Sequence, residues 1–219
     1  MLMRVAIIGA SGFVGTSLLS EALTHDDLQI TAIVRNVAAL PKHARLTANS
    51  CDVHDSDALA NALRGHDAVV HAYQPNRESS DIYERGVAGH RSIIDAAKKV
   101  GLPRLLAVGG AASLKTPEGV EYIESPLWDK AFDPYKKGIL CTRALYYILK
   151  EENQLDWVVI APSVMLRPGE LTRQFRYGHD HMLFDAAGNS RISLEDYAFA
   201  MVDELRNPHH HRERFTVGY

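Results

Sequence analysis

The sequence has few cysteines, no long apolar run and no block of basic residues, and each absence excludes a class of protein. Cys51 and Cys141 have neither metal-site spacing nor the number for a disulfide framework, so we expect buried thiols. No apolar run is long enough to span a membrane and no leader pattern is present, which predicts a cytoplasmic protein without a membrane partner. The net charge of -3, without clustered Lys and Arg, argues against a nucleic-acid partner. Small molecules are the expected partners, and the sequence carries no signal for the oligomeric state.

What the chain does contain is a regular alternation of short apolar runs, typical of strands, with stretches of helical hydrophobic periodicity. Its 219 residues, 46% of them hydrophobic, suit one domain over 1–219. Short apolar runs predict strands at 5–8, 29–34, 46–51, 68–72, 105–108, 157–161 and 212–217. Helical periodicity predicts helices from 14, from 56, over 82–100, over 135–152 and from 193. Strands that alternate with helices pair in parallel, so the expected fold is α/β, with a doubly wound parallel sheet and helices on both faces.

Residues 163–192 interrupt this alternation. They are rich in Gly, Arg and His, and we expect a small, irregular C-terminal lobe on the substrate side of a cleft. Arg167, Arg173 and Arg176 would there receive an anionic substrate; the alternative is that they are solvated or form ion pairs. The tract from His209 to His211 is interpreted as a solvated turn rather than a metal site, which would need further ligands.

The most informative stretch is the glycine-punctuated end of the first predicted strand. Gly9 permits a sharp turn, Gly12 permits close approach of a pyrophosphate, and Gly15 permits close packing of the following helix on the sheet. The helix N-terminus offers free N–H groups to phosphates. A tight strand-to-helix turn without a ligand is the alternative. The residues predicted to hold a dinucleotide here are Gly9, Ser11, Gly12, Phe13, Val14 and Gly15.

Several motifs together resemble the atypical short-chain dehydrogenase/reductase family. They are the G-x-x-G-x-x-G spacing, the Val108–Leu114 loop, Leu155-Asp156-Trp157 with Pro162, Arg167-Pro168-Gly169, and the stretch from Gly188 to Ala198. Members are described as NAD(P)H-flavin reductases or NAD-dependent epimerase/dehydratase-like proteins, and the family also resembles biliverdin reductase B. The resemblance implies a Rossmann-like fold, a nicotinamide cofactor, and often the absence of a tyrosine-lysine catalytic pair.

The residue after the second strand bears on the choice between NAD and NADP. An acidic side chain there would pair with the ribose 2′-hydroxyl, whereas this chain has Arg35, which favours NADP(H) because a guanidinium binds phosphate. An ordinary exposed arginine is the alternative. Asp52-Val53 resembles the pair with which short-chain reductases hold adenine, although Asp52 could instead start a turn with His54.

Residues near the other strand ends are candidates for the nicotinamide side and for the chemistry. The resemblance places Ser113 where short-chain dehydrogenases bind the substrate carbonyl, with a backbone-capping serine as the alternative. Tyr135 lies about where extended members have their tyrosine, but the lysine position four residues later is Ile139. Tyr146 and Lys150 have the right spacing near the helix end, where a packing tyrosine with a surface lysine is favoured. The nicotinamide side is expected to include His71, Ala72, Tyr73, Gln74 and Pro162.

These observations favour direct hydride transfer from NADPH to a planar, conjugated small-molecule acceptor such as a flavin, a quinone or a tetrapyrrole. Such acceptors take a proton from solvent, so no tyrosine-lysine pair is required. A non-catalytic NAD(P)-binding redox sensor is the alternative from another class. A nucleotide-sugar epimerase or dehydratase is favoured least, because that chemistry needs the acid/base pair.

Overall fold

Seven parallel strands and one antiparallel edge strand form the main sheet of the computed structural model, which describes residues 2–76 and 78–219. The strands are β1 (Met3–Ile8), β2 (Leu28–Val34), β3 (Leu46–Ser50), β4 (Ala68–His71), β5 (Arg104–Val108), β6 (Asp156–Pro162), β8 (Arg176–Gly178) and β10 (Glu213–Gly218). Their order is β3-β2-β1-β4-β5-β6-β10-β8. β1 therefore lies between β2 and β4, and the chain order reverses there, which is where such sheets bind ligands beyond the carboxyl ends of their strands.

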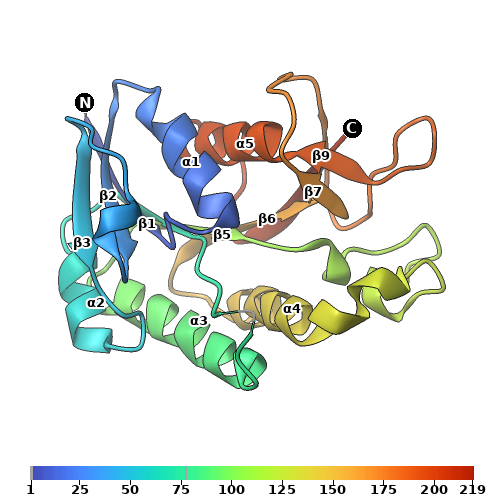
Figure 1. Ribbon diagram of the computed structural model, residues 1–219, viewed down its shortest axis with the longest axis horizontal. Helices are drawn as coiled ribbons and strands as arrows, with labels where there is room; N and C mark the ends of the chain where they lie inside the picture. The colour runs from blue at the N-terminus through green and yellow to red at the C-terminus, as the bar shows by residue number, and fades with distance from the viewer. Residues whose placement is uncertain (1, 77) are drawn as a thin grey trace.

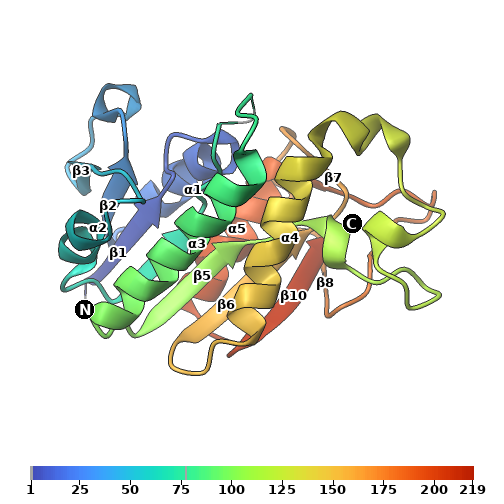
Figure 2. The same cartoon turned by 90° about the horizontal axis from the view of Figure 1, so that it is seen from below.

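Helices cover both faces of this sheet, as Figures 1 and 2 show. One face carries α1 (Phe13–Leu23) and α5 (Leu194–Arg206), which pack on each other. The other carries α2 (Ser56–Leu63), α3 (Ile82–Lys99) and α4 (Lys136–Lys150). A separate apolar core fills each interface between helices and sheet. The predicted Rossmann-like α/β fold is thus confirmed.

The sequence explains why these elements begin where they do. All four residues of β4 are buried between the two helical layers, so its short apolar run needs no polar alternation. Asp55 caps α2, because its carboxylate accepts a hydrogen bond from the N–H of Ala58 at 3.0 Å. Ser193 caps α5 in the same way through the N–H of Asp196. The long helix predicted from Tyr135 begins one residue later, after the 3₁₀ segment η4 (Lys130–Tyr135).

Residues 163–192 contain more regular structure than their composition predicts. β7 (Met165–Arg167) and β9 (Arg191–Ser193) form a two-stranded parallel sheet, and β8 pairs antiparallel with β10. β7, β8 and β9 have three residues each, which is too short to show an alternating pattern. Their backbone groups are satisfied by pairing partners distant in the sequence, which local propensity does not encode.

Candidate functional site

The turn between β1 and α1 is built from three closely packed glycines. Gly9 has a φ of +82°, and a Cβ there would lie 2.6 Å from the carbonyl oxygen of Ala72 at the end of β4. A Cβ on Gly15 would lie 2.0 Å from the carbonyl oxygen of Gly9, so the first turn of α1 packs directly on the loop backbone. Gly12 is the N-cap of α1 and lines a cleft together with Phe13. The helix N-terminus is therefore directed at the place where a phosphate would bind.

This cleft has a volume of ≈ 1570 Å³ and follows the carboxyl ends of β1, β2, β4 and β5. One small ligand usually occupies a pocket of about 300–1,000 Å³, so the cleft has room for a cofactor and a second molecule. Of the residues predicted to bind the cofactor or to lie on the nicotinamide side, Gly15 and His71 are absent from its lining, and Gly15 packs behind the turn. Those that line it are Gly9, Ser11, Gly12, Phe13, Val14, Arg35, Asp52, Val53, Ala72, Tyr73, Gln74 and Pro162.

Arg35 and Asp52 lie at the end of the cleft beside β2 and β3. The Arg35 side chain is exposed, directly after the buried Val34 that ends β2. Asp52 forms the turn considered as the alternative, because its carboxylate accepts a hydrogen bond from the N–H of His54 at 3.0 Å. Since this bond uses one oxygen and Asp52 still lines the cleft, the turn and a ligand contact are compatible.

The segment from Ala72 to Gln74 connects the cofactor side of the cleft to α4. The Gln74 amide donates a hydrogen bond to the carbonyl oxygen of Gly138 at 3.0 Å and accepts one from the Thr142 hydroxyl at 3.3 Å. His71, predicted with this segment, is fully buried and does not line the cleft. The β-strand pleat explains this difference, since it directs the His71 side chain into the layer between the sheet and α3.

Tyr135, the last residue of η4 and the N-cap of α4, lines the cleft with 57% of its surface exposed. Ile139, which also lines the cleft, occupies the position where a lysine would be needed, so no tyrosine-lysine pair forms there. Tyr146 and Lys150 do not line the cleft. Tyr146 instead packs under the guanidinium of Arg214, 3.9 Å from its ring centroid. That packing agrees with the interpretation favoured for the second pair.

Ser113 lies outside the cleft lining, in contrast to the position expected for a residue that contacts substrate. Its hydroxyl oxygen accepts a hydrogen bond at 2.8 Å from Arg214, which also donates to the Ser113 carbonyl oxygen and pairs with Asp180. The side chain is 3% exposed. A serine after a strand can point either into the cleft or into the protein, and here the buried guanidinium determines its orientation.

Three aromatic residues that the sequence analysis did not single out form the far wall of the cleft. The rings of Tyr122 and Trp128 are 5.2 Å apart, and those of Trp128 and Phe132 are 5.7 Å apart, measured between centroids. The indole N–H of Trp128 donates to a carboxylate oxygen of Asp133 at 2.8 Å, and the Lys136 ammonium lies 5.8 Å from its ring centroid. Tyr122 and Phe132 lie in the short 3₁₀ segments η3 (Tyr122–Glu124) and η4, and Trp128 lies in the loop between them, where no periodic pattern marks these residues.

This wall, and not the lobe at 163–192, borders most of the far end of the cleft. Of the lobe, Ser163, Val164 and Leu166 reach the lining. The arginines predicted there to receive an anion lie elsewhere. Arg176 donates to the carbonyl oxygen of Tyr219 at 2.6 Å, and the Arg173 guanidinium lies over the ring of Phe199. Both side chains are exposed and neither contact is with a side-chain carboxylate, which corresponds to the alternative of solvated arginines.

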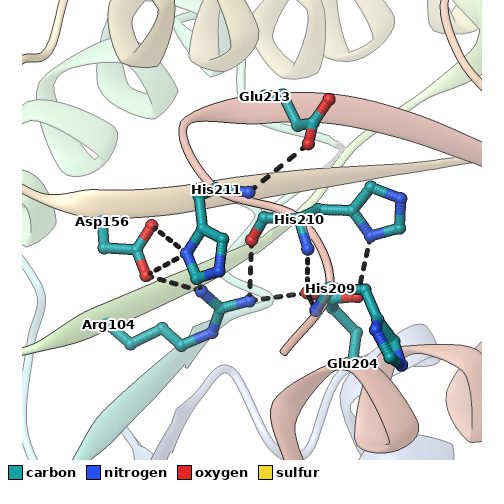
Figure 3. Close-up of polar contacts among 7 residues, drawn as sticks. All are labelled: Arg104, Asp156, Glu204, His209, His210, His211 and Glu213. Atoms are coloured by element: carbon teal, nitrogen blue, oxygen red, sulfur yellow. Dashed lines mark hydrogen bonds and ion pairs between the residues drawn. The ribbon is translucent and has the colours of Figure 1, made fainter. Parts of the chain in front are cut away.

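The histidine tract forms a turn just before β10, near the first residues of β5 and β6, and Figure 3 shows its polar contacts. The nearly buried Glu204 accepts hydrogen bonds from the N–H groups of His209 and His210, and from the His210 ring. Arg104 joins Glu204 to Asp156 with two ion pairs of 2.6 Å. Across residues 2–76 and 78–219, no cluster of three or more His, Cys, Asp or Glu side chains has the arrangement of a metal site. The tract is therefore held in place by the Glu204 carboxylate, which Arg104 at the start of β5 links to Asp156 at the start of β6.

A glycine turn at a helix N-terminus, placed where a doubly wound sheet reverses its order, defines a dinucleotide-binding α/β protein. Consistent with this class, the family model described as NAD(P)H-binding matches residues 9–208. The chain belongs to this NAD(P)H-binding family.

Relatives and solved structures resemble the chain over nearly its whole length. YwnB of Bacillus subtilis is 33% identical over 220 residues, which cover 98% of each chain. A proposed epimerase of Bacteroides thetaiotaomicron is 39% identical, with a TM-score of 0.91 and coverage of 100% of this chain and 98% of that one. A proposed NADH-flavin reductase of Streptococcus pneumoniae is 26% identical, with a TM-score of 0.84 and 99% coverage of both. Among the described helices, none is both long and apolar enough to cross a membrane.

Proposed function

We propose that this protein is an NAD(P)H-dependent oxidoreductase that transfers a hydride to a planar, conjugated small molecule such as a flavin, a quinone or a tetrapyrrole. The observation that carries the proposal is the continuity of the cleft, which has the glycine turn at one end and Trp128 with Phe132 at the other. Its volume accommodates two ligands. The flavin-reductase description of the Streptococcus pneumoniae neighbour supports this acceptor class.

The residues of the cleft would bind and orient rather than exchange protons. The nicotinamide, when bound, supplies the hydride. Gly12 and the N-terminus of α1 would hold the pyrophosphate. The backbone of Tyr73 and Gln74 lines the cleft between this turn and α4. Trp128 offers an aromatic face that the Asp133 carboxylate holds in place, and against which a flat acceptor stacks. Positioning of two reactants in a partly dry cleft accounts for rate enhancement without a protein acid.

We further propose that NADPH is the preferred cofactor. Arg35 lines the cleft next to Asp52, at the strand end where the 2′-position of the adenosine ribose would lie. A guanidinium forms charge-assisted hydrogen bonds with a phosphate and stacks on an adenine ring. An exposed arginine at this strand end therefore favours a phosphate-bearing ribose over an unmodified one.

The two alternative functions differ in whether they need Tyr135 as a catalytic acid and base. A redox sensor would bind NADPH without turnover, and Ile139 in the lysine position favours it because the usual acid catalyst is incomplete. An epimerase, as proposed for the Bacteroides thetaiotaomicron neighbour, would need Tyr135 as acid and base. Under the proposed reductase mechanism, Tyr135→Phe changes turnover by less than about threefold, whereas loss of a general acid costs about 10²- to 10⁴-fold.

The test is NADPH oxidation by the purified protein against a panel of flavins, quinones and biliverdin, with NADH in parallel. Cofactor binding is measured separately by fluorescence titration. We expect acceptor-dependent oxidation with at least one planar compound. Tight binding of NADPH without turnover across the panel would favour the sensor instead.

A further inference from the structure

Three buried side chains form a hydrogen-bonded row, named the file below, directly behind the Ala72–Gln74 segment of the cleft. His71 ends β4, His90 belongs to α3 and Cys141 belongs to α4. The Nε2 atom of His71 lies 3.0 Å from Nδ1 of His90, and Nε2 of His90 lies 3.2 Å from the Sγ atom of Cys141. None of the three side chains is more than 1% exposed. The file starts at the cleft, because the backbone N–H of Tyr73 donates to Nδ1 of His71 at 3.3 Å.

The donors and acceptors along this file permit one arrangement of hydrogens. A backbone N–H only donates, so Nδ1 of His71 must be the unprotonated nitrogen of a neutral ring. The hydrogen on Nε2 of His71 then points at Nδ1 of His90, which must also be unprotonated. His90 therefore carries its hydrogen on Nε2 and donates it to the Cys141 sulfur. Each neutral ring fixes the tautomer of the next.

Burial keeps all three groups in the neutral form that this arrangement requires. Desolvation, together with the neighbouring imidazole, holds the pKa of His71 well below 6.5, and desolvation lowers the pKa of His90 to about 4. Burial raises the pKa of the Cys141 thiol to about 11. The file is consequently uncharged at physiological pH.

Two glycines of α3 leave the space that the file occupies. A Cβ on Gly86 would lie 2.1 Å from the Cys141 sulfur, and a Cβ on Gly89 would lie 2.4 Å from the Tyr73 ring. The two glycines therefore let Cys141 of α4 and the Tyr73 ring pack closely against α3.

We propose that His90 is a positioning residue for cofactor binding. It fixes the tautomer of His71, so that His71 accepts the Tyr73 N–H and holds the Ala72–Gln74 backbone in the shape that lines the cleft. Without an acceptor at position 90, the hydrogen on Nε2 of His71 lies buried and unpaired. The alternative tautomer places a hydrogen on Nδ1, against the Tyr73 N–H, and displaces that segment.

The test compares two variants of residue 90. His90→Asn retains an acceptor oxygen in place of Nδ1, whereas His90→Leu retains similar bulk without an acceptor. We expect His90→Leu to raise the Kd for NADPH about tenfold and His90→Asn to raise it less than about threefold. Equal Kd values for His90→Leu and the wild type would overturn the proposal. Cofactor titration needs no acceptor, so this outcome is independent of whether the protein is a reductase.

A spectroscopic measurement on the wild-type protein separates positioning from a merely structural role. Nitrogen chemical shifts of ¹⁵N-histidine-labelled protein identify which ring nitrogen carries the hydrogen. We expect His71 and His90 both to carry it on Nε2, and His90→Asn to leave the His71 pattern unchanged. A hydrogen on Nδ1 of His71 in the wild type contradicts the proposal, even if His90→Leu fails to fold.

Discussion

A Cβ on Gly15 would lie 2.0 Å from the carbonyl oxygen of Gly9, whereas a Cβ on Gly12 would lie 3.2 Å from the same oxygen. The two later glycines of one motif therefore have different tasks. Gly15 meets backbone that cannot move without disrupting the turn, and it does not line the cleft. Gly12 has more room and lines the cleft at the helix N-terminus. Alanine substitutions separate the packing task from the ligand task.

Gly15→Ala should lower the free energy of unfolding by about 1–3 kcal/mol, because the added methyl overpacks a rigid contact. Gly12→Ala should leave stability within about 1 kcal/mol of wild type, since its neighbour has only to shift by a few tenths of an ångström. It should nevertheless weaken NADPH binding, because the methyl lies where the pyrophosphate approaches. Thermal melts without cofactor and binding titrations measure the two effects. Wild-type affinity in Gly12→Ala would refute the proposed phosphate position.

Arg35→Asp should weaken NADPH binding at least about tenfold and change NADH binding far less. The carboxylate repels a 2′-phosphate and accepts a hydrogen bond from a 2′-hydroxyl. Arg64→Asp, at an exposed position that does not line the cleft, provides a matched change in net charge. Equal losses for the two cofactors in Arg35→Asp would rule out this role for the arginine.

Trp128→Ala should reduce kcat/KM for the acceptor about tenfold or more while leaving the Kd for NADPH within about twofold. The substitution removes a stacking surface at the end of the cleft distant in sequence from every cofactor-binding candidate. Trp128→Phe keeps a ring and should recover most of the activity. Leu127→Ala is the control, because Leu127 is exposed and lies outside the lining. Equal losses in the alanine and phenylalanine variants would show that stacking is not what Trp128 contributes.

Acidification below about pH 6.5 should destabilise the folded protein. The pKa of His90 is lowered to about 4 and that of His71 is also lowered, whereas an unfolded chain regains values near about 6.5. As the pH falls, the unfolded state binds these protons before the folded state does. The stability that the two neutral histidines contribute is therefore fully present above about pH 6.5 and is lost as the pH approaches 4. In His90→Asn one such group is gone, and its melting temperature should fall less steeply over this window. Parallel curves for the two proteins would contradict the assignment.

The fold was predictable because its signals are local. The buried run before Gly9 and the capping residues Asp55 and Ser193 set element boundaries within a few residues of the sequence. Parallel pairing then follows from alternation. The half of the cleft proposed to bind the cofactor was equally predictable, since the carboxyl ends of parallel strands meet at one edge of the sheet.

The half of the cleft proposed to hold the acceptor was not predictable, because it depends on the orientation of side chains in irregular segments. Ser113 was expected to face the cleft, but the distant Arg214 draws its hydroxyl inward. Trp128 lies in a loop with no periodicity, and its place in the cleft depends on Asp133 and on packing against Tyr122. The burial of His71 follows from strand pleating together with His90 on a helix 19 residues away in sequence.

The measurement that tests the central claim most directly is acceptor-dependent oxidation of NADPH deuterated at one or the other face of nicotinamide C4. A cleft that fixes cofactor and acceptor against each other uses one face only. We therefore predict turnover with at least one planar acceptor, with a primary isotope effect for one deuterated form and none for the other. Saturable binding of NADPH with no oxidation by any flavin, quinone or tetrapyrrole would contradict the account.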